Sequence, residues 1–377
     1  MKTCSIFGST GTIGRKALEV AKDSDFNILA ITGRSKADIL IEQALKYRPK
    51  YVGISHEENY SIVREALFGE KQIEVVPEDE IDELARLDVD CCVMAVSGTT
   101  TGVGPTFACL GHAKRLAIAS KEPIIIGGKL LMAMAERNGT EIIPIDSEHS
   151  AIFQCVVGED RRSVERLILT ASGGPFLDFE ESELDAVATI EATLNHPKWK
   201  MGTKISVDSA TMLNKAFEII EAAILFDIDI SKITAIMHPE AVIHGLVEFS
   251  DGNVKALISP PDMTLPISYA MNYPGRINSC GARMVNLRDM HFVEQKDWQR
   301  RNIGLGYRAF CENKSIALTM ADSIAVSRFL DGKIGFTQIY EIIDEILNQS
   351  PTEEIKSYDD IRSIIEESAY DQKKRIE

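Results

Sequence analysis

Short apolar runs alternate with longer amphipathic segments along the first 146 residues. The apolar runs predict strands at 4–7, 28–32, 51–54, 89–96, 116–119 and 142–145. Strands that alternate with helices are typical of βαβ units, whose strands form a parallel sheet. The pattern therefore predicts an α/β domain over residues 1–146.

The pattern changes after residue 146. Apolar runs at 167–170, 235–237, 242–249 and 254–258 predict further strands, and residues 209–226 predict one amphipathic helix. This mixture predicts a central α+β domain over residues 147–290, the domain to which the motifs below assign catalysis. Beyond Trp298, apolar residues recur at helical spacing between turns at 331–332 and 350–351. A small C-terminal helical domain is therefore expected over residues 291–377.

Charge and composition exclude some classes of partner. The 377 residues carry a formal net charge of −16, which would repel nucleic-acid backbones and anionic lipid surfaces. The N-terminus leads directly into an apolar strand, and no apolar stretch approaches the roughly 20 residues that a membrane span requires. We therefore expect a soluble, cytoplasmic protein with no nucleic-acid or membrane partner.

The seven cysteines lack CxxC spacing, and several lie within apolar runs. We interpret them as reduced core residues, while a catalytic thiol with a partner distant in sequence remains the alternative. The cysteines are Cys4, Cys91, Cys92, Cys109, Cys155, Cys280 and Cys311.

A glycine-rich loop follows the first predicted strand. Gly8, Gly11 and Gly14 form a GxxGxxG pattern ahead of a helix predicted at 15–22. Such glycines let the backbone approach a pyrophosphate, and the helix N-terminus offers its N–H groups to the anion. The loop predicts a Rossmann-type dinucleotide site, and a glycine turn without a ligand is the alternative.

The end of the second predicted strand indicates which dinucleotide binds. It reads Thr32-Gly33-Arg34-Ser35, whereas an NAD site would place an acidic residue there to bind the ribose 2′-hydroxyl. An arginine and a hydroxyl suit a 2′-phosphate, which an acid would repel. NADPH is therefore the expected cofactor, and a solvated surface arginine is the alternative.

Three carboxylates predict a metal site. Asp146 and Glu148 follow a strand at its carboxyl end, and Glu218 can share a helical face with Asn214 and Lys215. Close carboxylates repel one another by about 4 kcal/mol per pair at an effective dielectric of 20, and a divalent cation reverses that sign. Oxygen ligands favour Mg²⁺ or Mn²⁺. Three unrelated surface acids are the alternative.

Other polar segments predict substrate contacts. Residues 170–175 and a helix start at Ser209 offer hydroxyl and backbone N–H groups to an anion. In the loop 196–204, Trp199 and Met201 lack periodic neighbours, which predicts a mobile lid; a tryptophan that fixes the loop to the core is the alternative. Lys121-Glu122 would point toward the nicotinamide, with a surface ion pair as the alternative, and His244 could reach the substrate.

Together these residues resemble the 1-deoxy-D-xylulose 5-phosphate reductoisomerase family over nearly the whole chain. The segments that carry the resemblance are GSTGTIG, IDSEHSAIFQ, TASGGPF, HPKWKMG, KISVDSATMLNKAFEIIEA and SPPDM. The resemblance implies a homodimeric enzyme that uses NADPH and a divalent metal, Mg²⁺ or Mn²⁺ with Co²⁺ as a further option. It implies conversion of 1-deoxy-D-xylulose 5-phosphate into 2-C-methyl-D-erythritol 4-phosphate, a step toward isoprenoid precursors.

The resemblance also implies residue roles. It makes Asp146, Glu148 and Glu218 the metal ligands and, with Lys121, the catalytic group. The implied NADPH contacts are Thr10, Gly11, Thr12, Ile13, Gly33, Arg34, Ser35, Ser120, Glu122 and Gly202. The implied substrate contacts are Lys121, Ser147, Glu148, Ser172, His196, Trp199, Ser209, Asn214, Lys215 and Glu218, with the phosphate held mainly by Ser172, Ser209, Asn214 and Lys215. Trp199 and Met201 would cover the substrate, and His244 and Met263 would line its site.

The family reaction is a skeletal rearrangement, most plausibly a retro-aldol cleavage and re-addition, followed by hydride transfer to an aldehyde. The metal would stabilise the enolate, and Glu148 is the candidate for moving protons. Four departures from the family pattern, at Ser120, Pro123, Ala241 and the run 318–326, put cofactor affinity and helical packing in doubt. A semialdehyde-dehydrogenase-like enzyme with a nucleophilic cysteine and an NADPH-binding regulatory module are the rival interpretations.

Overall fold

The computed structural model describes residues 1–199, 201–277, 285, 287 and 290–376. The chain forms two compact units, each built from separate stretches of sequence. Unit 1 comprises Met1–Pro123, Leu131–Ser150 and Asp262–Ala282, and unit 2 comprises Ile124–Leu130, Ala151–Pro261 and Arg283–Glu377. The division into three domains at 146 and 290 stays a prediction.

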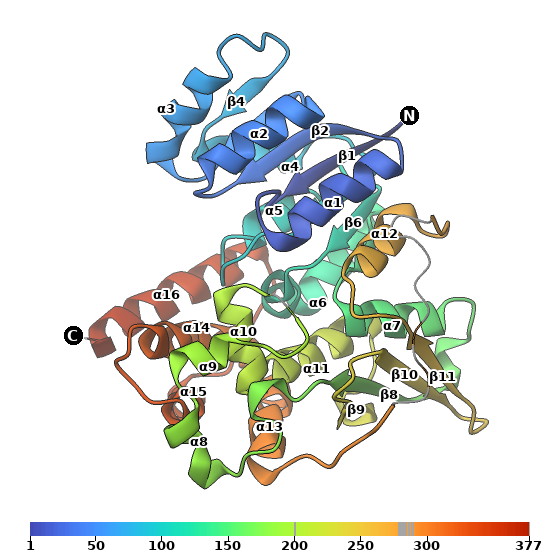
Figure 1. Cartoon of the computed structure of the whole chain (residues 1–377), viewed down its shortest axis with the longest axis vertical. Coiled ribbons are helices and arrows are strands. Elements are labelled where there is room, and N and C mark those ends of the chain that lie inside the picture. Colours follow the sequence, from blue (N-terminus) through green and yellow to red (C-terminus); the bar gives the residue numbers. More distant parts are fainter. Residues whose placement is uncertain (200, 278–284, 286, 288–289, 377) are drawn as a thin grey trace. The chain divides into compact units, whose positions relative to one another are not determined.

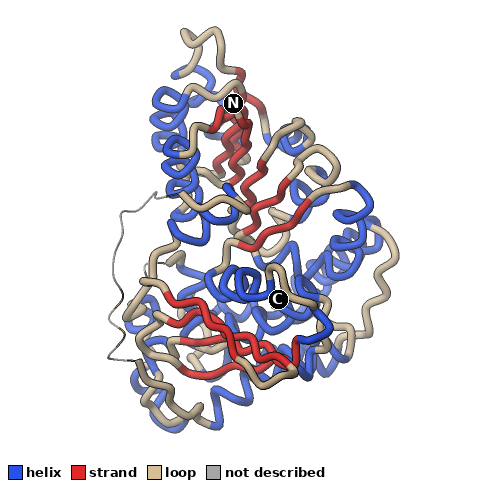
Figure 2. Tube along the Cα trace, turned by 90° about the vertical axis from the view of Figure 1, so that its right-hand side faces the viewer, coloured by secondary structure: helices blue, strands red, loops and turns tan. Residues whose placement is uncertain are grey.

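Unit 1 is built on a parallel sheet of seven strands in the order β4-β3-β2-β1-β5-β6-β7. All six strands predicted for this region are present, and the additional β4 is only three residues long. The strand order reverses between β1 and β5, and α/β sheets bind ligands at such a switch point. The strands, drawn in red in Figure 2, are β1 (Lys2–Phe7), β2 (Phe26–Gly33), β3 (Tyr51–Ile54), β4 (Glu74–Val76), β5 (Cys91–Met94), β6 (Arg115–Ile118) and β7 (Glu141–Pro144).

Helices connect the strands of unit 1 (Figure 1). Helix α1 buries Ala17, Leu18 and Ala21, whose three- and four-residue spacing gives one apolar face. Helix α12 joins this unit from a distant part of the sequence, and Lys16 of α1 donates to Asp262 and Thr264 at its start. The helices are α1 (Thr12–Asp23), α2 (Ala37–Tyr47), α3 (Glu57–Ala66), α4 (Ile81–Ala85), α5 (Val103–Ala108), α6 (Lys121–Asn138) and α12 (Thr264–Asn272).

Unit 2 contains a mixed sheet of four strands in the order β11-β10-β8-β9. Strands β8 and β9 are parallel, while β10 is antiparallel to both of its neighbours. All four strands were predicted. They are β8 (Val164–Ala171), β9 (Ile233–Met237), β10 (Ile243–Phe249) and β11 (Val254–Ile258).

The remaining helices belong wholly or mainly to unit 2. The predicted helical C-terminal part is confirmed, and Ile339 and Ile343 form the buried face of α15. The helices are α7 (Ser147–Val156), α8 (Glu181–Val187), α9 (Ile190–Leu194), α10 (Thr203–Ala210), α11 (Leu213–Phe226), α13 (Asp297–Cys311), α14 (Ser315–Leu330), α15 (Thr337–Gln349) and α16 (Tyr358–Ile376). Across the described residues, no helix combines the length and the apolar character that a membrane crossing requires.

The prediction of one continuous helix over 209–226 is wrong. The chain forms α10 and α11 instead, with a break at Met212, whose φ of 66° is left-handed. The Thr211 hydroxyl donates back to the Val207 carbonyl, and Asn302 donates to the Thr211 carbonyl, so the break is held from both sides. Ser209 therefore lies near the end of α10, and the helix start expected there is at Leu213 instead.

Candidate active site

The glycine loop of unit 1 has two positions that require glycine. Gly8 has a φ of 79°, and a Cβ atom there would clash with the Ala95 carbonyl. A Cβ atom at Gly14 would clash with the Gly8 carbonyl, so this glycine allows α1 to pack closely on the loop. Helix α1 begins at Thr12, earlier than predicted, which puts Thr12 and Ile13 in its first turn. The loop thus presents the helix N-terminus that anion binding uses.

The loop is fixed to the end of β2 through Thr32. The backbone N–H of Ser9 donates to the Thr32 carbonyl at 2.8 Å, and that of Gly8 donates to the Thr32 hydroxyl at 3.1 Å. Arg34 and Ser35 follow on the surface, and within the described part of the chain the Arg34 side chain has no hydrogen-bond or ion-pair partner. The guanidinium is therefore available to a ligand phosphate.

Ser120 and Lys121 lie at the start of α6. The Ser120 hydroxyl donates to the Val96 carbonyl at 2.7 Å, which ties the end of β6 to the segment after β5. Pro123 occupies the third helical position, where a missing N–H leaves no helical hydrogen bond unmade. The two departures from the family pattern are thus accommodated in the local structure.

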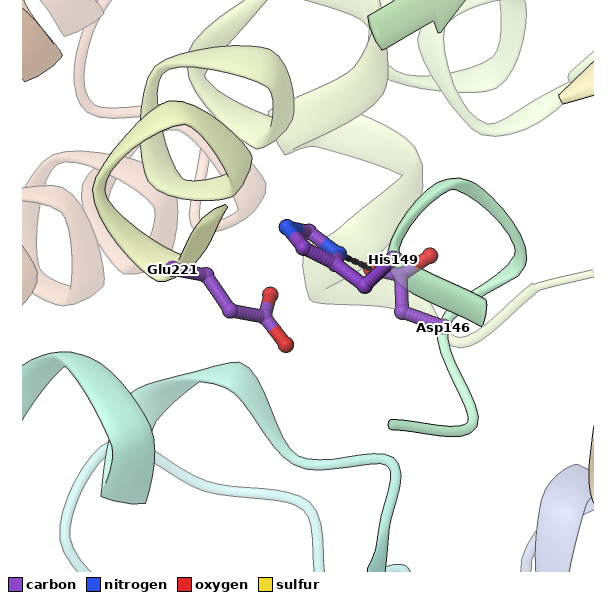
Figure 3. A group of neighbouring side chains, drawn as sticks. All are labelled: Asp146, His149 and Glu221. Carbon is purple, nitrogen blue, oxygen red and sulfur yellow. Dashed lines mark ion pairs between the residues drawn. The ribbon is translucent and has the colours of Figure 1, made fainter. Parts of the chain in front are cut away.

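Asp146 follows β7 and is paired with the buried Lys121 ammonium. The Nδ1 atom of the fully buried His149 lies 3.7 Å from the Asp146 carboxylate, across the first turn of α7 (Figure 3). The Ser147 hydroxyl donates to the Glu148 carboxylate in the same turn. Sequence reasoning gave His149 no role, although its position three residues after Asp146 in a helix was the available signal.

In unit 2, the turn after β8 carries Ser172. Gly173 and Gly174 have φ values of 84° and 65°, which favour glycine. A Cβ atom at Gly174 would lie 3.1 Å from the Ser209 carbonyl. The turn after β8 therefore lies against the end of α10, which brings together two of the segments expected to bind phosphate.

His196 connects Ser172 to the loop that carries Trp199. Its Nδ1 atom accepts the backbone N–H groups of Lys198 at 3.1 Å and Trp199 at 3.0 Å. Burial lowers the pKa of His196 to about 4, so the ring is neutral at pH 7 and its proton is on Nε2. Nε2 then donates to the Ser172 hydroxyl, 3.1 Å away, which leaves the hydroxyl hydrogen to donate to a ligand oxygen.

The Trp199 ring packs beside the His244 ring of β10, with centroids 6.4 Å apart. The His244 Nε2 atom donates to the Ser259 carbonyl at 3.1 Å, which fixes that ring. The contact suits a lid that closes on β10 and equally a tryptophan that fixes the loop, so the lid near 196–204 stays a prediction. Lys200 of this loop lies outside the described residues.

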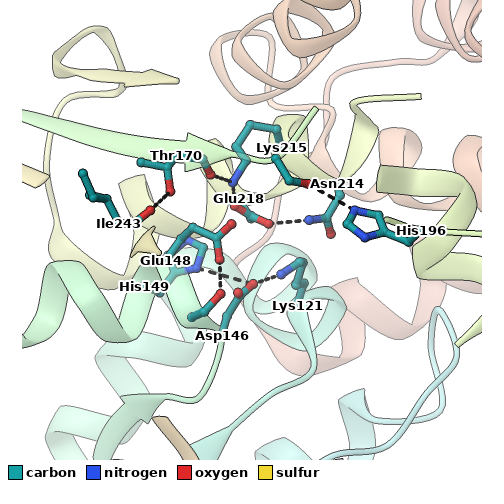
Figure 4. Close-up of polar contacts among 12 residues, drawn as sticks. Lys121, Asp146, Glu148, His149, Thr170, His196, Asn214, Lys215, Glu218 and Ile243 are labelled. Carbon is teal, nitrogen blue, oxygen red and sulfur yellow. Dashed lines mark hydrogen bonds and ion pairs between the residues drawn. The ribbon is translucent and has the colours of Figure 1, made fainter. Parts of the chain in front are cut away.

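Helix α11 presents a buried polar cluster. The Lys215 ammonium donates to the Thr170 carbonyl and to one oxygen of Glu218, and Asn214 donates to the other Glu218 oxygen (Figure 4). Lys215 is 3% and Glu218 1% exposed. Glu221, one turn further along α11 and equally buried, is drawn in Figure 3. Sequence reasoning did not single out Glu221, because the spacing of hydrophobic and polar residues does not reveal that an acidic side chain is buried.

The unusual run 318–326 packs well in α14. Asp322 is fully buried, and its carboxylate lies 2.5 Å from the Lys204 ammonium. Lys204 also contacts Asp208 at 2.7 Å, so one ammonium joins both turns of α10 to α14. These ion pairs anchor α10, which begins at Thr203 within the segment 196–204.

The described cysteines do not favour thiol chemistry. Burial raises the pKa of Cys91 to about 12 and that of Cys155 to about 11, which suppresses the reactive thiolate. Cys4, Cys92 and Cys109 are buried as well. Cys311 is exposed, contrary to its interpretation as a core residue, and Cys280 lies outside the described residues.

Three family models match the chain. The model of 1-deoxy-D-xylulose 5-phosphate reductoisomerase matches residues 4–128, and that of the 1-deoxy-D-xylulose 5-phosphate reductoisomerase C-terminal domain matches residues 142–226. A model described as the DXP reductoisomerase C-terminal domain matches residues 258–370. The matches together span both units.

Whole-chain comparisons agree with these models. The 1-deoxy-D-xylulose 5-phosphate reductoisomerase of Caldanaerobacter subterraneus subsp. tengcongensis is 41% identical over 372 residues, covering 97% of this chain and 96% of the relative. That of Thermoanaerobacter sp. strain X514 is 40% identical, covering 97% of each.

Two solved structures are similar throughout. The reductoisomerase of Zymomonas mobilis in complex with NADPH has a TM-score of 0.89 and 34% identity, covering 97% of each chain. A DOX-P reductoisomerase in complex with NADPH, fosmidomycin and magnesium has a TM-score of 0.87 and 35% identity, covering 92% of this chain and 89% of the other.

Proposed function

The chain belongs to the 1-deoxy-D-xylulose 5-phosphate reductoisomerase family, and we propose that its own residues carry out the family reaction in the roles given below. The protein is an NADPH-dependent enzyme that converts 1-deoxy-D-xylulose 5-phosphate into 2-C-methyl-D-erythritol 4-phosphate, a step of non-mevalonate isoprenoid precursor synthesis. The observation that carries this conclusion is about 40% identity to relatives of that name over 97% of the chain.

NADPH binds along the carboxyl edge of the unit 1 sheet in this proposal. The first turn of α1 holds the pyrophosphate, and Arg34 with Ser35 holds the 2′-phosphate. Support comes from Gly8 and Gly14, where a side chain would clash with the backbone. Support also comes from the Arg34 guanidinium, which has no partner within the described residues. The further proposed contacts are Thr10, Gly11, Thr12, Ile13, Gly33, Ser120, Glu122 and Gly202.

The substrate phosphate binds at the turn after β8 and the start of α11. The Ser172 oxygen accepts a hydrogen bond from His196 Nε2, so its own hydroxyl hydrogen is directed to a phosphate oxygen. Asn214 keeps a second amide hydrogen after its contact with Glu218. Lys215 brings the positive charge, and Ser209 adds a hydroxyl from the end of α10.

The proposed metal ligands are Asp146, Glu148 and Glu218, one of two sets of side chains in the described residues that could hold a metal ion. Carboxylate oxygens fit a hard ion such as Mg²⁺, the ion in the related structures. A bound ion would supply a Lewis acid for the substrate's carbonyl and hydroxyl oxygens. Lys121 orients Asp146, and Glu148 moves a proton to or from a substrate hydroxyl with Ser147 holding its carboxylate.

The loop 196–204 excludes water from the reacting atoms. Trp199 and Met201 cover the substrate against His244 and Met263 in this proposal. The ring contact between Trp199 and His244 supports a position of the loop over β10. Water exclusion strengthens electrostatic contacts and protects the reactive intermediate.

We also propose a cytoplasmic homodimer. Strand β11 is one of the two edge strands of the unit 2 sheet, and its Val254 and Ile258 are 52% and 40% exposed. An exposed apolar edge strand is a ready surface for a second copy of the chain. Free thiols at the six described cysteines are typical of the reducing cytoplasm.

One assay tests the function. NADPH oxidation by the full chain should require both 1-deoxy-D-xylulose 5-phosphate and a divalent ion, and should stop with a chelator and resume when Mg²⁺ is added back. Thiol alkylation should leave activity intact. NADPH loss that persists in chelator but stops on alkylation would favour a cysteine-dependent dehydrogenase instead, and no substrate-dependent loss would favour a regulatory module.

A further inference from the structure

The Glu218 carboxylate contacts both donors that the proposed function assigns to the substrate phosphate on α11. One oxygen accepts from Asn214 and the other from Lys215. The same carboxylate is one of the proposed metal ligands. A single buried acid therefore contacts the proposed phosphate-binding residues and is also one of the proposed metal ligands.

This shared position affects the electrostatic field at the phosphate. Lys215 and Glu218 are almost fully buried, so water and salt screen their charges weakly. A carboxylate in contact with the ammonium cancels much of the attraction that Lys215 exerts on an arriving anion. Conversely, a cation that is coordinated by Glu218 offsets the negative charge of the carboxylate and so restores the attraction between Lys215 and the anion.

We propose that Glu218 restrains phosphate binding by pairing with Lys215 and Asn214, and that ligation of the divalent ion by Glu218 relieves the restraint, so that ion and phosphate strengthen each other's binding. The inference rests on the proposed function for the roles of Lys215 and Glu218. It couples the two parts of the site, since the phosphate is held more firmly when the metal site is filled. Linkage makes the effect reciprocal, and such couplings are typically about 5- to 150-fold.

The decisive measurement is phosphate affinity without metal. Inorganic phosphate is titrated calorimetrically into the full chain in chelator, for the wild type and for Glu218→Gln. The glutamine keeps the shape of the side chain and removes its charge, so phosphate should bind the variant roughly tenfold more tightly than the wild type. A loss of packing would only weaken binding, so this gain separates the proposal from a structural role.

Two further variants show whether the gain passes through Lys215. In Lys215→Ala, the added change Glu218→Gln should give no gain, because the ammonium that it releases is missing. The matched control Glu248→Gln removes the same charge from the exposed pair with Arg166 and should leave phosphate affinity unchanged. If phosphate affinity rises equally for Glu218→Gln in the wild type, for Glu218→Gln in Lys215→Ala and for Glu248→Gln, the gain reflects net charge alone and overturns the proposal.

The outcomes also separate this inference from the proposed function. If the wild type binds phosphate and Lys215→Ala weakens it, but Glu218→Gln binds no more tightly, the coupling fails and the phosphate site stands. If Lys215→Ala has no effect on phosphate, the site assignment itself fails. If Glu218→Gln loses NADPH binding and so does not fold, the test uses the wild type and Lys215→Ala. Added Mg²⁺ should then raise the phosphate affinity of the wild type more than that of Lys215→Ala. An equal rise in the two proteins overturns the coupling.

Discussion

The Nε2 atom of His196 lies 3.1 Å from the Ser172 hydroxyl oxygen, while its Nδ1 atom accepts two N–H groups of the adjoining loop. The two ring nitrogens therefore make separate contacts, one with the turn after β8 and one with the backbone of the loop that carries Trp199. Burial lowers the pKa of His196 to about 4, so both contacts persist through the neutral pH range.

Two substitutions should separate these roles. His196→Asn places an acceptor near the former Nδ1 position, so the loop stays ordered while KM for the substrate rises roughly three- to tenfold, as expected for one lost hydrogen bond. His196→Gln reaches Ser172 but not the loop, so it should keep KM closer to wild type and make the loop more sensitive to protease. Steady-state kinetics and limited proteolysis provide the two measurements, and identical behaviour of the variants would argue against separate roles.

Arg34 should set the choice of cofactor. Its side chain is exposed at the end of β2, and its charge favours the 2′-phosphate that distinguishes NADPH from NADH. Arg34→Asp should weaken NADPH binding much more than NADH binding, because a carboxylate repels that phosphate and accepts from a 2′-hydroxyl. Dissociation constants for both nucleotides test this, and an unchanged NADPH/NADH ratio would remove Arg34 from the site.

Sequence patterns predicted the strands of both sheets because each strand is a local apolar run. They missed β4, whose three residues are too few for a pattern, and the break at Met212, which occurs without glycine or proline. The contact of Lys204 with Asp322 joins segments far apart in sequence, so only the tertiary structure reveals it. Residue types at strand ends pointed to the candidate site, and the spacing of His149 from Asp146 was a signal that sequence reasoning did not use, whereas the buried Glu221 had no local signal.

Glu353 should make stability depend on pH. Its carboxylate accepts the N–H groups of Ile316 at 3.0 Å and Ala317 at 2.7 Å, at the start of α14. Burial raises its pKa from the ordinary 4.5 to about 7. The folded state thus holds the proton more tightly than the unfolded state, and the free energy of unfolding should fall as pH rises from about 4.5 to about 7.

Glu353→Gln removes this titration and keeps an oxygen acceptor for the helix. The stability of the wild type relative to this variant should therefore be greater at pH 5 than at pH 8. Urea unfolding at the two pH values measures the difference. A wild-type advantage that is the same at both values, or greater at pH 8, would contradict the raised pKa.

The loop 196–204 should become protected when substrate binds. Trp199 is half-buried beside His244, whereas Trp298 is fully buried, so acrylamide should quench Trp199 selectively. If the loop closes, substrate with NADPH and Mg²⁺ should reduce both acrylamide quenching and proteolysis within the loop. A tryptophan that only fixes the loop to the core predicts the same quenching and cleavage with and without substrate.

Asp146 and Glu148 should differ in what they contribute to catalysis. Asp146 is paired with Lys121, which suits a ligand held in place for the ion, whereas Glu148 is held by the Ser147 hydroxyl and is the candidate proton carrier. Asp146→Asn should therefore raise the Mg²⁺ concentration needed for half-maximal activity by about tenfold or more, because the ion loses one charge-assisted contact. The kcat of this variant should partly recover at saturating metal.

Glu148→Gln should lower kcat by about a hundredfold even at saturating metal, because proton transfer by a positioned group contributes at least about that much. NADPH affinity, measured by fluorescence titration, should stay near wild type in both variants, since neither residue is among the proposed cofactor contacts. If added metal restores Glu148→Gln to full turnover, Glu148 serves only as a ligand and the proton must move by another group.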